Sequence, residues 1–343
     1  MTQFQALIPG LPEELAIECL SRLHHTAHLA AAAAVCRRWH HLIKSRDFFN
    51  HRKKTGRTQF AACLIQAVIP HGIDEELTGP PASGITFFDP MNLEWNRVDT
   101  VHDFPDGVPL FCQVSSSEGK LVLMGGWHPK SFQEMSSMFV YDITTRRFRR
   151  VKDMPSKRSL FATGEIHGKV FVAGGHDEEK NALDSAWVYD IEGDAWTELT
   201  RMSEKRDECH GLVIGSEFWV ISGYDTDHQG MFKPSAEVYD TELAQWRRVE
   251  DAWNWCQSPK LCVGAGKNGK LINWAELNSE VRVGTCAVEL GNRILVSGSA
   301  ADEETRRCFL VERDENGEYG AFKELTVPRK FQGVIRSACC VEI

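Results

Sequence analysis

Three similar stretches decide the fold: KLVLMGGWHPKSFQEMSSMFVYDITTRRFRRV at residues 120–151, KVFVAGGHDEEKNALDSAWVYDIEGDAWTEL at 169–199, and FWVISGYDTDHQGMFKPSAEVYDTELAQWRRV at 218–249. They recur about every 49 residues. Each reads as an apolar strand that ends in glycine, a polar loop, a strand that ends in Tyr-Asp, a turn, and a strand with one large aromatic residue. Such self-similarity predicts a repeated β-sheet unit.

Each feature of the repeat has a mechanical reason. Gly125-Gly126 and Gly174-Gly175 allow the backbone to turn where a β-carbon would clash. The Val-Tyr-Asp segment places an apolar and an aromatic side chain on a strand, and its Asp begins a turn. The aromatic residue of the last strand is Phe148, Trp196 or Trp246, and we expect it to fill space between neighbouring sheets.

Weaker copies flank the three clear ones. Phe87-Phe88-Asp89 with Trp95 is typical of the back half of a first unit, whose front strand is predicted at 60–65. A late unit is predicted at 293–322. The interval between Gly223 and Gly298 is one and a half periods, so we expect a degenerate unit there.

The twin glycines, the Tyr-Asp pair and the last-strand aromatic resemble the kelch motif. A period near 50 with four strands is that of kelch propeller blades. The resemblance implies an all-β kelch propeller over residues 58–343, with six blades of which one is degenerate; five blades is the alternative. The final stretch VIRSACCVEI (334–343) is predicted to pair with 60–66, which closes the ring and removes two exposed edges.

Residues 1–57 have a helical period instead. In the first predicted helix, Leu15, Ala16, Cys19, Leu20 and Leu23 recur at helical spacing, whereas Ile17 lies off that face. A second apolar face is predicted along one continuous helix, comprising Leu29, Ala32, Cys36, Trp39 and Ile43. A helical segment this short buries little core on its own, so its spare apolar residues predict a partner.

The stretches LIPGLPEELAIECLSRL (7–23) and HLAAAAAVCRRWHHLI (28–43) together resemble an F-box. The resemblance implies a small all-α domain that docks on the Skp1-type adaptor of a cullin-RING ubiquitin ligase. The residues that it places at this contact are Leu11, Pro12, Leu15, Ile17, Leu20, Leu23, Leu29, Val35, Cys36 and Trp39. The alternative is a helical cap packed on the following domain.

Charge and composition narrow the functional classes. The formal net charge is −9, and residues 58–343 carry 30 Lys/Arg against 44 Asp/Glu, which argues against nucleic-acid binding. We find no apolar run long enough to span a membrane and no secretion signal. The 11 cysteines form no C-x-x-C pair, as expected of reduced thiols in a protein of the cytoplasm and/or nucleus.

No catalytic, metal-binding or cofactor-binding pattern is evident. The histidines of the helical region lack the glutamate of an H-E-x-x-H motif, and there is no G-x-S-x-G or P-loop. We therefore expect no cofactor and no enzymatic activity. The rival interpretation is a kelch enzyme or ligand-binding propeller unrelated to ubiquitin.

Loops of the propeller are the better candidates for binding a target protein, because aromatic and charged side chains gather in them. The predicted target-binding residues are Trp127, His128, Arg158, His176, Asp177, Arg206, Tyr224, Asp225, Trp253 and Trp255. Packing between blades is the alternative for Trp253 and Trp255. Arg158 and Arg206 occupy equivalent positions, which also suggests a structural hydrogen-bonding role.

The sequence as a whole is thus interpreted as the substrate receptor of an SCF-type ligase. Its F-box would bind Skp1 and, through it, a cullin, while the propeller would hold a target for ubiquitination and proteasomal degradation. The carboxyl-terminal CCVEI is similar to the end of plant F-box proteins with kelch domains. That resemblance implies targets such as phenylalanine ammonia-lyase or a cytokinin-response regulator, between which the sequence does not choose.

Overall fold

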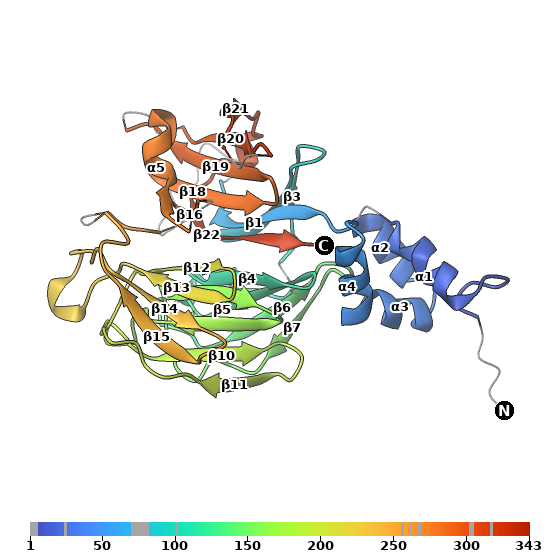
Figure 1. The fold of residues 1–343 in the computed structure, drawn as a ribbon, viewed down its shortest axis with the longest axis horizontal. Coiled ribbons are helices and arrows are strands. Elements are labelled where there is room, and N and C mark those ends of the chain that lie inside the picture. Colours follow the sequence, from blue (N-terminus) through green and yellow to red (C-terminus); the bar gives the residue numbers. More distant parts are fainter. Residues whose placement is uncertain are drawn as a thin grey trace.

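The computed structural model describes residues 6–23, 26–69, 82–100, 102–254, 257–260, 262–266, 269–301, 305–315 and 318–343. A group of four helices, which we call the helical domain, lies beside a ring of β-sheets (Figure 1). The helices are α1 (Glu13–Ser21), α2 (Thr26–Ala33), α3 (Arg37–Ile43) and α4 (Arg46–Lys54). Across these described ranges, no helix is long and apolar enough to cross a membrane.

The helical domain has its own small core. It comprises Leu7, Ala16, Leu20, Leu29, Ala32, Ala33, Ile43 and Phe48. The prediction of one continuous second helix is wrong, because Cys36 adopts extended backbone with φ −158° and separates α2 from α3. Its Sγ accepts a hydrogen bond from the Trp39 backbone N–H at 3.5 Å, so Cys36 is the N-cap of α3 rather than part of a helix interior.

Five antiparallel sheets of four strands form most of the ring. From the inner to the outer strand, blade 1 consists of β22 (Ile335–Glu342), β1 (Phe60–Ala67), β2 (Ser83–Asp89) and β3 (Glu94–Arg97). In the same order, blade 2 consists of β4 (Gln113–Ser117), β5 (Lys120–Met124), β6 (Met138–Asp142) and β7 (Arg147–Val151). Blade 3 consists of β8 (Ala162–Ile166), β9 (Lys169–Ala173), β10 (Ala186–Asp190) and β11 (Ala195–Glu198). Blade 4 consists of β12 (His210–Ile214), β13 (Glu217–Ile221), β14 (Ala236–Asp240) and β15 (Gln245–Val249). Blade 6 consists of β18 (Val283–Leu290), β19 (Arg293–Ser299), β20 (Arg307–Glu312) and β21 (Lys323–Glu324).

The fifth position of the ring holds a reduced blade. Among its described residues, two strands are present, β16 (Val263–Ala265) and β17 (Leu271–Asn273), followed by the short helix α5 (Trp274–Leu277). Because β16 contacts the inner strands β12 and β18 on either side, it completes a ring of six positions. The expectation of an all-β propeller with one degenerate unit is confirmed: among the described residues it has five complete blades, the number of the alternative prediction, and one reduced unit at the sixth position. Trp274, the first residue of α5, is fully buried against blade 6.

The carboxyl-terminal strand closes the ring. β22 pairs antiparallel with β1, with Phe60 opposite Glu342 and Cys63 opposite Cys339. This is the predicted pairing, and it makes β22 the inner strand of blade 1. Cys339 packs into the core between blades 1 and 2, whereas Cys340 packs into the core between blades 1 and 6. Neighbouring residues of one strand therefore serve two different inter-blade cores.

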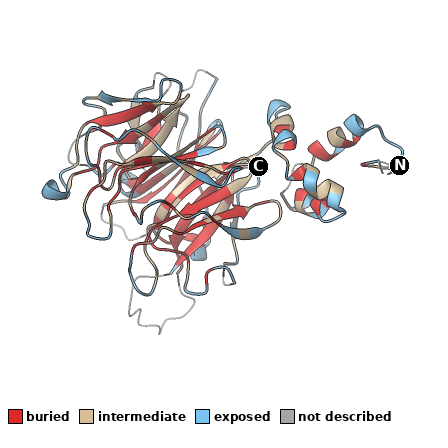
Figure 2. Ribbon diagram, turned by 90° about the horizontal axis from the view of Figure 1, so that it is seen from below, coloured by how far each residue is buried: buried red, intermediate tan, exposed pale blue. Residues whose placement is uncertain are grey.

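Buried residues are concentrated in the strands of the propeller (Figure 2), and their side chains form cores shared by neighbouring blades. The outer-strand aromatics also reach the preceding blade, as predicted: Trp196 Nε1 donates to the Lys152 carbonyl at 3.2 Å, and Trp246 Nε1 to the Thr200 carbonyl at 2.7 Å. Gly126 has φ +85°, and a β-carbon there would lie 2.4 Å from the Leu110 carbonyl oxygen, so only glycine fits at this turn.

Consecutive strands of a blade run antiparallel, so their connections alternate between two faces of the ring. The turns β4–β5, β6–β7 and β8–β9 meet the helical domain, and we call their side the junction face. The loops that follow Gly126, Gly175 and Gly223, together with the connections that lead into each inner strand, form the opposite side. We call it the distal face. The predicted target-binding residues that the structure describes all lie on the distal face.

Candidate functional site

The helical domain exposes apolar side chains on one side. Leu11, Leu15 and Cys19 follow one another at intervals of four residues and are all exposed, with Leu15 at 51%. Val35 is exposed at 63%. The Arg38 guanidinium lies 2.7 Å from the Glu13 carboxylate, which brings the start of α3 next to the first turn of α1. The exposed apolar residues thus belong to two adjoining segments, as in a surface that another protein covers.

The ten residues predicted to contact an adaptor divide into three groups. The exposed ones are Leu11, Pro12, Leu15, Val35 and Cys36. The half-buried ones are Ile17, Leu23 and Trp39. Leu20 and Leu29 lie inside the helical core at 4% and 2% exposure, so the structure corrects their assignment as direct contacts.

The predicted face of the first helix is also corrected. Ala16 and Leu20, four residues apart, point into the core, and Ile17 and Leu23 pack against its edge. Leu15 and Cys19 each lie one residue before a buried position and are therefore turned about 100° away from it. On α1, the side chains of Leu15 and Cys19 point away from the helical core, whereas Ile17 packs against its edge.

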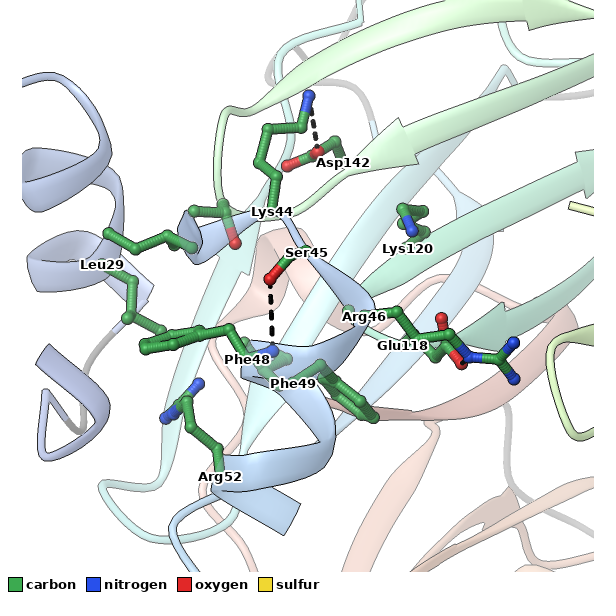
Figure 3. Close-up of a pocket in the computed structure, with 14 residues that line it drawn as sticks. Leu29, Lys44, Ser45, Arg46, Phe48, Phe49, Arg52, Glu118, Lys120 and Asp142 are labelled. Carbon is green, nitrogen blue, oxygen red and sulfur yellow. Dashed lines mark hydrogen bonds and ion pairs between the residues drawn. The ribbon is translucent and has the colours of Figure 1, made fainter. Parts of the chain in front are cut away.

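Salt bridges hold the helical domain against the junction face, at the pocket drawn in Figure 3. Lys44 Nζ lies 3.2 Å from the Asp142 carboxylate, and Arg46 Nε lies 2.6 Å from the Glu118 carboxylate. Lys53 Nζ lies 2.6 Å from the carboxylate of Glu342, at the end of the closing strand. These contacts span blades 1 and 2, so they orient the helical domain relative to the propeller.

A second electrostatic group joins α1 to the end of the helical domain. Glu18 receives hydrogen bonds from Arg57 at 2.5 and 2.8 Å and from Arg22 at 3.0 Å. The Arg57 hydrogen bonds, followed by those from Arg22, lower the pKa of the Glu18 carboxyl to about 2. Glu18 is therefore ionised throughout the physiological range and ties the first helix to the segment that leads into β1.

On the distal face, a hydrogen-bonded series crosses three blades. Trp127 Nε1 donates to Ser159 Oγ at 2.9 Å, Ser159 Oγ lies 2.7 Å from His176 Nε2, and His176 Nδ1 lies 2.8 Å from Asp207. Each hydrogen-bond donor of this series has an acceptor if the Ser159 hydroxyl donates to His176 Nε2 and the His176 Nδ1–H donates to Asp207. Lys180 adds a cation–π contact, with Nζ 3.9 Å from the Trp127 ring centre.

The order serine, histidine, aspartate is that of a hydrolase triad. Here Ser159 is fully buried, and its Oγ already accepts a hydrogen bond from Trp127. This placement favours a structural link between blades 2, 3 and 4. Within the described part of the chain, no three His, Cys, Asp or Glu side chains are grouped so as to hold a metal ion.

Arg158 and Arg206 are buried, and the structure corrects their assignment as target contacts. Arg206 Nη1 donates to the Ser222 and Ser235 carbonyls, both at 2.9 Å, and Arg158 Nη1 reaches the equivalent carbonyls of blade 3. Burial lowers the pKa of the Arg158 guanidinium to about 10, which leaves it charged at neutral pH. Both arginines fasten the distal ends of their blades.

The remaining predicted target residues differ in their accessibility. Trp127, His128, Asp177 and Asp225 are half-buried. His176, Tyr224 and Trp253 are buried, at 4%, 4% and 6% exposure. The Tyr224 hydroxyl donates to the Glu208 carboxylate at 3.0 Å, and Trp253 packs between blades 4 and 5. These three side chains belong to the framework beneath the surface, and Trp255 lies outside the described residues.

Several distal-face residues escaped prediction from sequence. Ser159 and Asp207 directly follow Arg158 and Arg206, so their repeated position was a usable signal. Glu134, which pairs with Lys180, and Phe111, whose ring lies 5.0 Å from that of Trp127, carry no such signal. Their contacts join different blades or separate segments, and only the closed ring brings them together.

Comparison with known proteins agrees with this architecture. Residues 59–260 match the family model described as the KLHDC2/KLHL20/DRC7 Kelch-repeats domain, and residues 8–53 match the F-box-like model. The chain is 32% identical over 364 residues to F-box/kelch-repeat protein At1g15670 of Arabidopsis thaliana, covering 98% of this chain and 99% of the relative. The chain belongs to the F-box/kelch-repeat proteins.

Two further Arabidopsis thaliana F-box/kelch-repeat proteins are more similar over a shorter range. At2g44130 is 38% identical over 278 residues, covering 73% of this chain and 67% of the relative. SKIP20 is 38% identical over 285 residues, covering 72% of this chain and 67% of the relative. All three relatives bear the name F-box/kelch-repeat protein, and the alignment with At1g15670 extends over nearly all of both chains.

Proposed function

We propose that this F-box/kelch-repeat protein is the substrate receptor of an SCF-type cullin-RING ubiquitin ligase. The exposed apolar residues Leu11, Leu15 and Val35 bind a Skp1-type adaptor, and a cullin binds through the adaptor. The distal face holds the target protein. In this function the chain acts by raising the effective concentration of the target near the ubiquitin-loaded enzyme.

One observation carries this proposal. The exposed apolar surface belongs to a helical domain that salt bridges attach to the junction face, whereas the half-exposed aromatic Trp127 lies on the opposite, distal face. Two partners can therefore bind at once without competing for space. A fixed relation between the two surfaces also supports a set distance between adaptor and target.

Adaptor binding is tested by placing charge on the apolar surface. The double variant Leu15→Glu/Val35→Glu is expected to lose co-purification with recombinant Skp1 while it keeps the melting temperature of the wild type, because both side chains are exposed. Leu243→Glu is a matched control, since Leu243 is 69% exposed in the β14–β15 turn of the propeller, outside the helical domain. Undiminished Skp1 binding by the double variant would overturn the F-box assignment.

Target binding is tested at Trp127. Truncating an interface aromatic commonly costs about 2 kcal/mol or more of binding free energy. We expect Trp127→Ala to weaken capture of an identified target and to leave Skp1 binding intact. Tyr224→Ala is the structural comparison: because Tyr224 is buried, it is expected to lower the melting temperature. Unchanged target affinity in a stably folded Trp127→Ala protein places the target elsewhere.

We propose phenylalanine ammonia-lyases or cytokinin-response regulators as targets, on the strength of the resemblance to plant F-box/kelch proteins. We further propose the cytoplasm and/or the nucleus as the site of action. Ubiquitination assays with the reconstituted ligase and each purified candidate distinguish the two target classes. A reconstituted ligase that ubiquitinates neither candidate contradicts both target assignments while leaving adaptor binding to its own test.

A further inference from the structure

A cavity of about 680 Å³ opens on the distal face, beside the reduced blade 5. Most of its lining lies at or just before the starts of the inner strands β4, β16, β18 and β22, and the rest comes from β17 and α5, so it lies at the distal mouth of the central channel. Two basic side chains, Lys260 and Arg336, share this lining with Phe111. Arg282 is exposed at its rim.

The Phe111 ring is the shared contact of two cationic side chains in the cavity. Its φ of +56° is unusual for a residue other than glycine, and its half-buried ring contacts both cations. Lys260 Nζ lies 5.2 Å from the ring centre, and Arg336 Cζ lies 5.8 Å from it. The same ring packs edge-on against Trp127 at 5.0 Å. A lining residue of the cavity thus contacts the aromatic residue that we assign to target binding.

The electrostatic surroundings favour an anion. Burial is the largest cause that lowers the pKa of both Lys260 and Arg336, and the charge of Arg336 lowers the pKa of Lys260 further. Burial, and then Lys260, lower the pKa of the neighbouring His210 to about 4. Among the residues that the structure describes, no carboxylate lies within salt-bridge distance of Lys260. The Lys260 ammonium is therefore partly desolvated without a neighbouring carboxylate, and an anion that binds beside it would stabilise its charge.

The nearby acids are already engaged. Asp207 and Glu208 act on Lys260 only at longer range. Asp207 is hydrogen-bonded to His176, and Glu208 accepts the Tyr224 hydroxyl. Glu276, the acidic residue of the lining, accepts a hydrogen bond from Asn273 Nδ2 at 3.0 Å.

We propose that this cavity binds an acidic segment of the target protein, with a carboxylate seated between Lys260 and Arg336 over the Phe111 ring. Arg282 at the rim fits a second acidic residue, and the exposed Val334 fits an apolar neighbour. The inference rests on the proposed function, because it names the chemistry of the segment that a substrate receptor would hold.

The test measures binding of a fluorescein-labelled oligoglutamate peptide to the full chain by fluorescence anisotropy. The wild type is expected to bind it with an affinity that falls as salt is added, and not to bind the oligoglutamine counterpart. Lys260→Gln is expected to weaken binding by about tenfold or more, since it removes one member of a desolvated charge pair. Lys270→Gln is the matched control, because Lys270 is an exposed lysine of the same blade in the β16–β17 turn on the junction face.

Arg336 donates to Ser83, so Arg336→Gln can affect folding, and Phe111→Leu provides an independent variant. We expect Phe111→Leu to weaken peptide binding at an unchanged melting temperature. Equal binding by the wild type and Lys260→Gln, or no binding by the wild type, overturns the inference. Inorganic phosphate that displaces the peptide at an equal concentration of charge also overturns it, because the cavity would then be a small-anion site. If one of these contrary results is obtained while Lys260→Gln and Phe111→Leu still bind Skp1 and the target, the proposed function stands and only the acidic-segment inference is rejected.

Discussion

Arg46 of α4 lies with its Nε 2.6 Å from the Glu118 carboxylate in the β4–β5 turn. The same guanidinium donates through Nη2 to the His167 carbonyl at 3.2 Å, in the turn of the next blade. One side chain of the helical domain thus contacts blades 2 and 3 together. Because a partly exposed ion pair contributes only about 0–1 kcal/mol of stability, its main effect is on orientation.

Charge reversal tests this junction. Arg46→Glu is expected to place two acids together and to loosen the helical domain, with little change in the melting temperature of the propeller. Small-angle X-ray scattering is expected to show a larger radius of gyration for this variant. The swapped pair Arg46→Glu/Glu118→Arg is expected to restore the compact value. Identical scattering by all three proteins would mean that other contacts set the orientation.

The Glu18 group predicts a pH dependence. The folded-state pKa of Glu18, about 2, lies below its ordinary value of 4.5, so its stabilising effect is complete above pH 4.5 and is lost as the pH falls towards 2. We expect Glu18→Gln to unfold the helical domain more readily than the wild type at neutral pH. The difference in melting temperature is expected to shrink between pH 4.5 and 2.

Glu14→Gln is the control for this experiment, because Glu14 is exposed on the same helix. It is expected to leave the melting temperature near that of the wild type. A difference between Glu18→Gln and the wild type that stays constant down to pH 2 would contradict the role of the Arg57 hydrogen bonds.

Ring closure is tested by deleting residues 334–343. The deletion removes the inner strand of blade 1, opens the edge of β1, and exposes the cores on both sides of that blade. We expect a lower melting temperature of the whole propeller and self-association through the opened edge, both measured on the purified protein. A truncated chain that stays monomeric and melts like the wild type would refute the closure.

The buried pair Arg206 and Glu237 predicts a non-additive effect. Their side chains are almost completely buried and lie 3.3 Å apart. Arg206→Met leaves the Glu237 charge uncompensated, and breaking a buried pair in this way costs about 3–5 kcal/mol. Adding Glu237→Gln removes that charge while its amide oxygen still accepts from the Ser203 N–H, so we expect part of the stability to return. Chemical denaturation of the two variants measures the difference, and a double variant less stable than Arg206→Met would contradict the prediction.

Much of the fold followed from local sequence. The repeats over 120–249 predicted the three outer strands of blades 2 to 4, and the unpaired strand at 334–343 predicted the closure, because strand alternation and turn glycines are written in consecutive residues. The helical period predicted the first helix but not its exposed side. In α1, only nine residues long, Leu15 and Ala16 suit a common apolar stripe equally well, and packing against the other helices buries Ala16 alone.

The sequence by itself determined the kind of repeated unit and the presence of a separate helical unit, and it left six or five blades open. The tertiary structure alone decided which side chains form surfaces. Arg206 is buried and hydrogen-bonded to backbone carbonyls of blade 4, whereas Trp127 is half-exposed, although both residues lie in distal loops. Lys260 and Arg336 meet on the Phe111 ring only because closure brings three remote inner-strand starts to one channel mouth. Contacts between blades depend on how the ring packs, and no local pattern of residues records that packing.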